Sequence, residues 1–379
     1  MYISRRVKAL PPAVLRLMVG ASRPTSVDLA FGEPFTGIDP DLLAAGLEIY
    51  RETRDGYTQN GGLPELRERL LQCQNLKYFS TWRNVVVTVG ATGALFALLL
   101  AVADSGDNVV LVEPCFFAYR AMAELLGLSV TAVELDAADD FAFNAARVAS
   151  AVTSHTKAII FCSPCNPTGR IYNQANLKEL ADLTATTGVW LVADETYRDF
   201  YYTVEPPASI GDVSDRAVVV RSFSKNCAMT GFRIGYLIGA EPLVDAVISV
   251  QRASLVCPPA ISQRVALTAL GNWSRWGDGM RGTYSILRET LLMAMAERLG
   301  WDIVPVEAGF FAFADIRRFG LNSAALARKV LDEADVVTVP GSAFGIGGEG
   351  YLRLSFSATP HQITTGIDRI ARWVEGDIC

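Results

Sequence analysis

The sequence predicts an α/β protein with two unequal parts: a mostly parallel sheet with helices on both faces, and a smaller α+β domain. Two observations lead to this prediction. From about residue 84 to residue 240, apolar runs of strand length alternate with segments of helical length. Nearly continuous apolar runs are typical of parallel strands that are buried on both faces. Beyond Trp301 the pattern changes to four short apolar runs around two helical segments, which indicates a separate α+β unit.

The individual elements follow from the apolar runs and the residues that flank them. Residues 41–53 are expected to be helical, and Pro64 followed by Glu65 marks the next helix start, because proline and acidic side chains favour the first helical turn. Residues 241–300 are expected to form helices with a break at Pro258 and Pro259. Strands are expected at 84–89, 107–112, 130–135, 158–162, 189–194, 218–220, 303–306, 310–314, 336–339 and 351–356, with a linker and helix over 136–152.

Composition and charge exclude several classes of protein. The chain has 379 residues, and 34 basic against 40 acidic side chains give a net charge of −6, so a nucleic-acid partner is not expected. No apolar run reaches the length of a membrane span, and the first residues lack the apolar stretch of a signal peptide. We therefore expect a cytoplasmic protein without membrane contact.

Cysteine and histidine usage argues against a metal site. The seven cysteines lie mostly in apolar runs, which favours reduced, buried thiols. Cys162 and Cys165 form a single pair, and no second pair exists to complete a zinc site. His155 and His361 are the only histidines. We expect no metal, and a redox role for the cysteine pair is the less favoured interpretation.

One stretch, residues 217–236, combines a buried strand with several polar side chains. The run Val218–Val220 is followed by Ser222, Ser224 and Lys225, and Arg233 comes eight residues after the lysine. Burying an ammonium is costly unless it is paired or neutralised. Lys225 is therefore either a surface lysine at a strand end or a nucleophilic amine whose pKa is lowered by desolvation and a nearby guanidinium.

This stretch resembles the Ser-x-Ser-Lys-x-x-x-Met-Thr-Gly-x-Arg-x-Gly-Tyr signature of the class I/II aminotransferases, the fold type I enzymes that use pyridoxal 5′-phosphate. The resemblance extends over roughly residues 28–375. It implies that Lys225 holds the cofactor as a Schiff base. It also implies a large cofactor-binding domain, residues 46–280, and a small C-terminal domain, residues 281–379. The N-terminal segment, residues 1–45, would pack with the small domain.

Two further features of the chain suit this cofactor. A strand, a Gly-rich turn and a helix leave the amides of Ala91 and Thr92 at a helix N-terminus, where unpaired N–H groups bind phosphate. Asp194 lies at the carboxyl end of a strand, where ligands of open α/β sheets bind. It either pairs with the pyridine nitrogen, which makes the ring an electron sink, or caps a helix.

The resemblance assigns expected roles to the remaining residues. Lys225, Asp194 and Tyr197 would be catalytic. Phe116 would stack on the cofactor ring, although Phe117 or Tyr119 would serve as well. Tyr57 would reach the cofactor phosphate of the neighbouring subunit in a homodimer. The complete set expected to contact the cofactor is Tyr57, Ala91, Thr92, Phe116, Asn166, Asp194, Tyr197, Ser222, Ser224, Lys225 and Arg233.

The substrate is expected to contact Gly32, in a Gly-Glu-Pro turn, Asn166, in Asn-Pro-Thr-Gly, and Arg353. An arginine in mid-strand is costly unless its fork meets an anion, and the resemblance assigns Arg353 to the α-carboxylate. Arg252 is a candidate for a distal carboxylate across the dimer interface, but a solvated helix-end residue is the favoured interpretation.

The expected reaction moves an amino group between an α-amino acid and a 2-keto acid. A lyase, cyclase or oxidase could use the same residues, since the cofactor supplies the electron sink for all of them. A ligand sensor without enzymatic activity is less favoured, because no basic helix-turn-helix extension is present. A nicotinamide enzyme would need a dinucleotide fingerprint, which no strand-to-helix turn provides.

Overall fold

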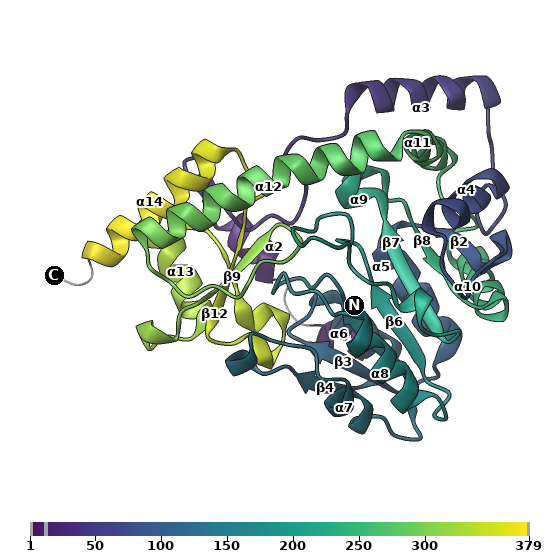
Figure 1. Ribbon diagram of the computed structural model, residues 1–379, viewed down its shortest axis with the longest axis horizontal. Helices are drawn as coiled ribbons and strands as arrows, with labels where there is room; N and C mark the ends of the chain where they lie inside the picture. Colours follow the sequence, from purple (N-terminus) through teal and green to yellow (C-terminus); the bar gives the residue numbers. More distant parts are fainter. Residues whose placement is uncertain (1–2, 11–13, 377–379) are drawn as a thin grey trace.

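The structure, a computed structural model, describes residues 3–10 and 14–376. A seven-stranded sheet forms the centre of its larger part (Figure 1). The strands are β2 (Val85–Thr88), β3 (Asn108–Glu113), β4 (Ser129–Glu134), β5 (Thr156–Cys162), β6 (Trp190–Asp194), β7 (Ala217–Ser222) and β8 (Gly235–Ile238). They lie in the order β2-β8-β7-β6-β5-β3-β4. β8 runs antiparallel to β2 and β7, and all other neighbours in this sheet are parallel.

The apolar strand runs are buried as their composition predicts. Every residue of β2, β3, β7 and β8 is buried. The expected α/β class with a mostly parallel sheet is therefore confirmed, and the antiparallel strand β8 is the one exception within it.

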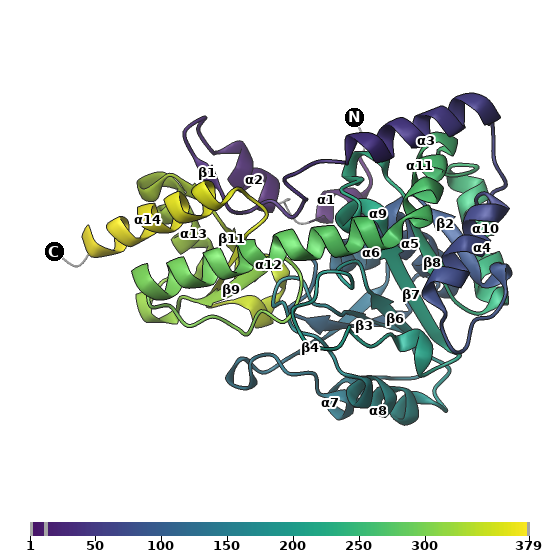
Figure 2. The same cartoon turned by 45° about the horizontal axis from the view of Figure 1, so that its top comes forward.

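Helices flank this sheet. They are α3 (Pro40–Thr53), α4 (Pro64–Gln74), α5 (Gly90–Val102), α6 (Ala118–Leu126), α7 (Ala145–Ser150), α8 (Gln174–Thr184), α9 (Phe223–Asn226), α10 (Glu241–Ser254) and α11 (Ala260–Gly271). α5 packs against β7 and β8, and α10 packs against α5 and β2. Figure 2 shows α7 and α8 below the sheet and α3 and α11 above it.

The smaller part contains a three-stranded antiparallel sheet in the order β11-β12-β9. Its strands are β9 (Phe311–Asp315), β11 (Val339–Pro340) and β12 (Tyr351–Ser355), and its helices are α13 (Ser323–Ala334) and α14 (Pro360–Gly376). The long helix α12 (Trp273–Arg298) extends from α11 to this part, where it packs against α14 (Figures 1 and 2). The expected domain boundaries at residues 45 and 280 fall inside α3 and α12.

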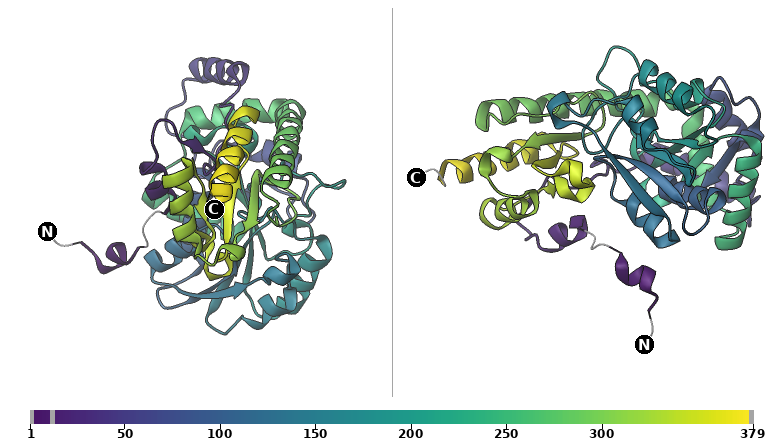
Figure 3. Two further views of the ribbon diagram at one scale, coloured as in Figure 1. Left: turned by 90° about the vertical axis from the view of Figure 1, so that its left-hand side faces the viewer. Right: turned by 90° about the horizontal axis from the view of Figure 1, so that it is seen from below.

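The N-terminal segment joins both parts. It contains α1 (Arg5–Ala9), α2 (Val14–Gly20) and β1 (Val27–Asp28), and Figure 3 shows the two purple helices projecting from one side of the molecule. α1 contacts α6 of the large part, whereas α2 contacts β11 of the small part. β1 pairs in parallel with β10 (Val336–Val337). α2 and β1 therefore lie beside residues more than three hundred positions later in the chain.

Two expected strands differ in the structure. The expected strand at 303–306 is wrong, because only Ile303 forms a bridge, to Ala314 of β9. Pro305 lacks the N–H group that would continue a ladder. The expected strand at 336–339 is divided: β10 pairs with β1, and β11 pairs with β12, so Thr338 lies between two different sheets.

Candidate active site

A cavity of about 910 Å³ lies beyond the carboxyl ends of β5, β6 and β7, facing β12 and the segment that follows β1. This is where open α/β sheets bind their ligands. The cavity is lined by all of the nominated residues except Tyr57 and Arg252. Those that line it are Gly32, Ala91, Thr92, Phe116, Asn166, Asp194, Tyr197, Ser222, Ser224, Lys225, Arg233 and Arg353.

Lys225 lies inside this cavity, on the short helix α9 that follows β7. Burial lowers the pKa of its amine from 10.5 to about 8, and the charges of Arg353 and Arg233 act in the same direction. Its Nζ donates a hydrogen bond to the carbonyl oxygen of Gly32. An amine with this pKa carries a free lone pair in a large share of molecules near pH 8, which a nucleophile or a base requires.

One end of the cavity is built to receive an anion. α5 begins at Gly90, whose φ of +70° suits glycine, and no side chain caps this helix. The amides of Ala91 and Thr92 therefore have no partner within the helix. A Cβ at Gly90 would lie 2.7 Å from Nη2 of Arg233, and one at Gly235 would lie 2.9 Å from the amide nitrogen of Ala91. Two glycines thus let a guanidinium and a helix N-terminus approach each other closely.

Two hydroxyl groups complete this end. The Oγ atoms of Ser222 and Ser224 lie 2.8 Å apart, and Ser222 Oγ also accepts a hydrogen bond of 3.1 Å from the amide of Ser224. Both residues line the cavity. Hydroxyls, helix amides and a guanidinium are together the donor set that a phosphate group requires.

A buried carboxylate also lines the cavity. Asp194, at the end of β6, is 7% exposed, and burial raises its pKa against the opposing effect of its hydrogen bonds. Its Oδ2 accepts a hydrogen bond of 2.7 Å from the hydroxyl of Tyr119, and its Oδ1 accepts one of 3.0 Å from the amide of Thr196. No helix begins at Asp194 in the structure, so the helix-cap interpretation is wrong.

Tyr119 is a residue whose role the sequence did not reveal. The sequence suggests it only as an alternative ring for stacking, whereas in the structure its hydroxyl donates a hydrogen bond to Asp194. The two residues are 75 positions apart, on α6 and β6, and no spacing pattern links them. Phe116 lies in the cavity wall with its ring centroid 5.7 Å from that of Tyr119.

A buried arginine occupies the side of the cavity formed by the smaller part. Arg353, on β12, is 2% exposed, and burial lowers the pKa of its guanidinium to about 10. It donates through Nη1 to Oδ1 of Asn166 at 2.9 Å and through Nη2 to the carbonyl of Ala30 at 2.6 Å. Its Nε is buried and has no partner among the described residues. A buried guanidinium with a free donor favours an anionic ligand.

Asn166 connects this arginine to Tyr197. Nδ2 of Asn166 lies 3.5 Å from the hydroxyl of Tyr197, while its Oδ1 accepts from Arg353. The guanidinium also lies 4.1 Å from the ring centroid of Phe311. Asn166, which the sequence assigned to both cofactor and substrate, thus lies between a phenol and a guanidinium.

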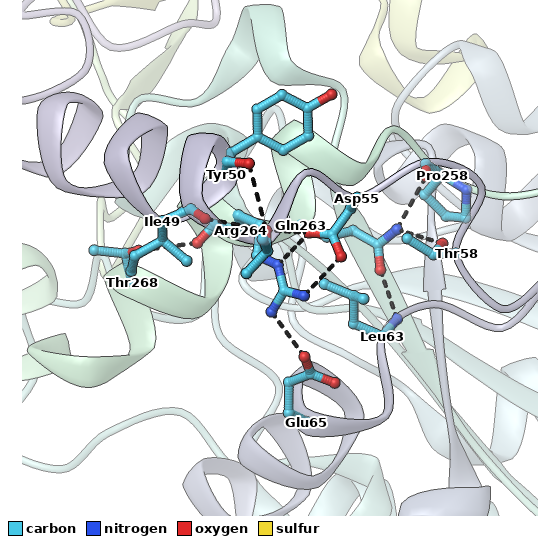
Figure 4. A network of polar contacts seen from close by, with 11 residues as sticks. Ile49, Tyr50, Asp55, Thr58, Leu63, Glu65, Pro258, Gln263, Arg264 and Thr268 are labelled. Atoms are coloured by element: carbon cyan, nitrogen blue, oxygen red, sulfur yellow. Dashed lines mark hydrogen bonds and ion pairs between the residues drawn. The ribbon is translucent and has the colours of Figure 1, made fainter.

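Tyr57 is the one residue of the expected cofactor-contacting set that lies outside the cavity. It is 87% exposed. The loop that carries it is held on both sides by α11 (Figure 4). Arg264 donates to Asp55 at 2.6 and 2.9 Å and to Glu65 at 2.7 Å. The neighbouring Gln263 accepts from the amide of Leu63 at 2.7 Å.

The structure gives less support to a functional role for Arg252 and for the cysteine pair. Arg252 is exposed in the last turn of α10 and does not line the cavity of its own chain. Burial raises the pKa of both Cys162 and Cys165, which disfavours the reactive thiolate. In the described part of the chain, no three His, Cys, Asp or Glu side chains come together in a way that could hold a metal ion.

Comparison with known proteins identifies the family. A sequence profile described as "Aminotransferase class I and II" matches residues 24–370. The chain belongs to the class I and II aminotransferases. It is 32% identical to a putative aminotransferase of Bacillus subtilis and 30% identical to an aspartate aminotransferase of Pyrococcus abyssi, with 98% of each chain covered in both cases.

Solved structures agree with this assignment. An aromatic aminotransferase from Pyrococcus horikoshii superimposes with a TM-score of 0.89 and 29% identity, over 96% of this chain and 99% of that one. The protein is therefore a pyridoxal phosphate-dependent aminotransferase, and these relatives support amino-group transfer over the lyase, cyclase and oxidase alternatives. No helix in residues 3–10 and 14–376 has both the length and the apolar character needed to cross a membrane.

Proposed function

We propose that Lys225 is the residue that carries amino-group transfer between an α-amino acid and a 2-keto acid. The observation that supports this role is an amine with a pKa of about 8 inside the cavity, where the charges of Asp194 and Arg353 both act on it. Lys225 would hold the aldehyde of pyridoxal 5′-phosphate, and its released amine would take the proton from the substrate Cα. The bound cofactor supplies an electron sink for the charge left on that carbon.

The residues present fit the cofactor. The helix amides of Ala91 and Thr92, the serine hydroxyls and Arg233 would hold its phosphate, because together they form a cradle of donors around a space that two glycines keep open. Asp194 would pair with the pyridine nitrogen and keep it protonated. The hydroxyl of Tyr119 and the amide of Thr196 orient this carboxylate and stabilise its charge.

We propose that Arg353, Asn166 and the backbone at Gly32 position the substrate. The guanidinium of Arg353 is held by Asn166 and by the carbonyl of Ala30, so its direction is set before a ligand arrives. Its fork suits the α-carboxylate of an amino acid. Preorganisation of this kind reduces the entropic cost of aligning Cα with the base.

The assay that tests this proposal follows the nitrogen atom. Purified holoenzyme is incubated with ¹⁵N-labelled alanine, phenylalanine or aspartate, with and without 2-oxoglutarate. We expect ¹⁵N-glutamate to form together with an equal amount of the new keto acid, only when 2-oxoglutarate is present. Lys225→Ala should abolish transfer, whereas Lys178→Ala, at an exposed lysine paired with Asp182 on α8, should not. Steady release of ammonia without a keto acid acceptor would contradict the proposal.

We also propose a homodimer in which Tyr57 completes the partner's site. Tyr57 is 87% exposed, yet its loop is held firmly by Arg264 and Gln263 (Figure 4). A fixed, outward-facing tyrosine suits a contact with a second copy. Co-expressed Tyr57→Ala and Lys225→Ala chains should form mixed dimers with one intact site, and so regain activity that neither chain has alone. Absence of any gain, or an active monomer in sedimentation, would contradict shared sites.

Two further assignments concern the domains and the location of the protein. We propose that residues 46–280 form the cofactor-binding domain and residues 281–379 the small domain, with residues 1–45 packed on the latter, which is supported by the pairing of β1 with β10. We propose a cytoplasmic location, which is supported by the free, buried thiols of Cys162 and Cys165. Fractionation of the producing cells and limited proteolysis test these two points.

A further inference from the structure

Part of the cavity wall has no role in the mechanism above. Beyond the residues that face the cofactor and the α-carboxylate, the wall contains Val19, Phe31 and Phe117, together with Glu33. The three apolar residues come from separate segments. Val19 is in α2, Phe31 is in the loop after β1, and Phe117 directly precedes α6. Three separate segments therefore contribute apolar side chains to the wall of this cavity.

Two of these side chains are aromatic and exposed. Phe31 is 42% and Phe117 is 37% exposed, and both still line the cavity. The ring of Phe117 is held with its centroid 4.4 Å from that of Phe116, so it is placed by packing. Ligand pockets are lined mainly by apolar and aromatic side chains, and a cavity of about 910 Å³ is at the upper end of the usual size range. It has room for more than the cofactor.

The charges of the cavity disfavour a second carboxylate. Among the described side chains that line it, the cations are Lys225, Arg233 and Arg353. Each of them already has a role at the amine, the phosphate or the α-carboxylate. Glu33 adds a negative charge that is close enough to raise the pKa of Lys225. A dicarboxylic substrate would therefore place its distal carboxylate near a like charge without a free cation from this chain.

We propose that this enzyme prefers amino acids with a large apolar side chain, either aromatic or branched, a proposal that rests on the function proposed above. Val19, Phe31 and Phe117 contact this side chain. Glu33 contributes to specificity by repelling the side-chain carboxylates of aspartate and glutamate. The specificity then depends on two features. The N-terminal segment and the start of α6 supply an apolar surface, and the negative charge of Glu33 disfavours dicarboxylic amino acids.

Single-turnover reaction of the holoenzyme tests this proposal without a second substrate. The loss of the cofactor's long-wavelength absorbance is followed after mixing with phenylalanine, leucine, alanine, aspartate, glutamate or lysine. We expect phenylalanine and leucine to exceed aspartate and glutamate in apparent kcat/KM by about tenfold or more. Equal or faster reaction of aspartate or glutamate would overturn the proposal. A preference for lysine would also overturn it, because Glu33 would then bind a cationic substrate side chain.

Variants separate the apolar surface from the charge. Phe31→Ala and Phe117→Ala should each lower the ratio of phenylalanine to alanine reactivity about tenfold. The matched control is Tyr78→Ala, because Tyr78 is an aromatic residue of 42% exposure outside the cavity. Glu33→Gln should raise the reactivity of aspartate relative to phenylalanine. If the two Phe variants change the ratio no more than the control does, the surface does not contact the substrate and the proposal fails.

A partner's arginine is the main alternative for substrate recognition. If Arg252 of a second copy binds a distal carboxylate, aspartate will react well in the wild type and Arg252→Ala will slow aspartate alone. That pair of results would overturn the proposal while leaving amino-group transfer intact. Reaction with none of the amino acids, alanine included, would instead refute the proposed function and this inference together.

Discussion

Replacing Lys225 by methionine should stabilise the cofactor-free protein at neutral pH. In the cavity, burial lowers the pKa of the amine from 10.5 to about 8, so the folded protein disfavours the charged ammonium. Between those two pH values the unfolded chain binds more protons than the folded one, and the free energy of unfolding therefore rises with pH. Below pH 8 the cost of the buried ammonium is fully present, and methionine removes it.

The size of the effect follows from the structure. The fall in pKa from 10.5 to about 8 corresponds to about 3 kcal/mol, at about 1.36 kcal/mol per pH unit. Methionine also loses the hydrogen bond from Nζ to the carbonyl of Gly32, which costs about 1 kcal/mol. We expect the free energy of unfolding to increase by about 2 kcal/mol at pH 7.

Urea denaturation of the cofactor-free proteins at pH 7 and pH 10.5 measures this difference. Lys225→Met should be more stable than the wild type at pH 7, and the advantage should disappear at pH 10.5, where the wild-type amine is neutral and keeps its hydrogen bond. Lys178→Met serves as the control, since that lysine is 65% exposed. Equal stability of Lys225→Met and wild type at pH 7, or the same gap at both pH values, would refute the reasoning.

Three substitutions test the other residues of the site. Asp194→Asn keeps the shape of the side chain but removes its charge, so turnover should fall about 100-fold or more with an unchanged circular dichroism spectrum; near-normal turnover would exclude a role at the ring. Tyr119→Phe removes a hydrogen bond to that carboxylate worth about 1.5–3 kcal/mol and should lower kcat/KM about tenfold to a hundredfold. Tyr172→Phe, at an equally buried tyrosine, is its control, and equal losses in the two would indicate a packing effect. Arg353→Lys cannot retain both hydrogen bonds and should raise KM for every amino acid more than it lowers kcat; an unchanged KM would remove Arg353 from carboxylate binding.

The sequence predicted the parts of the fold that depend on local patterns. The continuous apolar runs located the buried strands, and polar residues at their carboxyl ends, such as Asp194 in β6 and Ser222 in β7, were expected in the cavity that they line. The predicted strand at 303–306 is wrong because its apolar run suggested pairing, whereas Pro305 has no N–H group to continue hydrogen bonding beside β9. Local composition does not specify the partner of a strand, so the division of 336–339 between two sheets was also missed.

Features of the site that depend on packing between distant segments were not predictable in this way. The hydrogen bond from Tyr119 to Asp194 joins residues 75 positions apart, and neither carries a local signal of the other. Phe31 and Phe117 line the same cavity although they are 86 positions apart, and the pairing of β1 with β10 fixes the segment that carries Phe31. Tyr57 is expected from the resemblance, but the contacts of Arg264 with Asp55 and Glu65 on either side of its loop follow from no local pattern.

The most direct test of the central assignment locates the cofactor on the chain. The purified holoenzyme is reduced with borohydride, digested, and the modified peptide is identified by mass spectrometry. The chain has six lysines, and we expect the pyridoxyl group on Lys225 alone, with no covalent cofactor retained by Lys225→Ala. Modification of another lysine, or covalent cofactor in Lys225→Ala, would contradict the assignment.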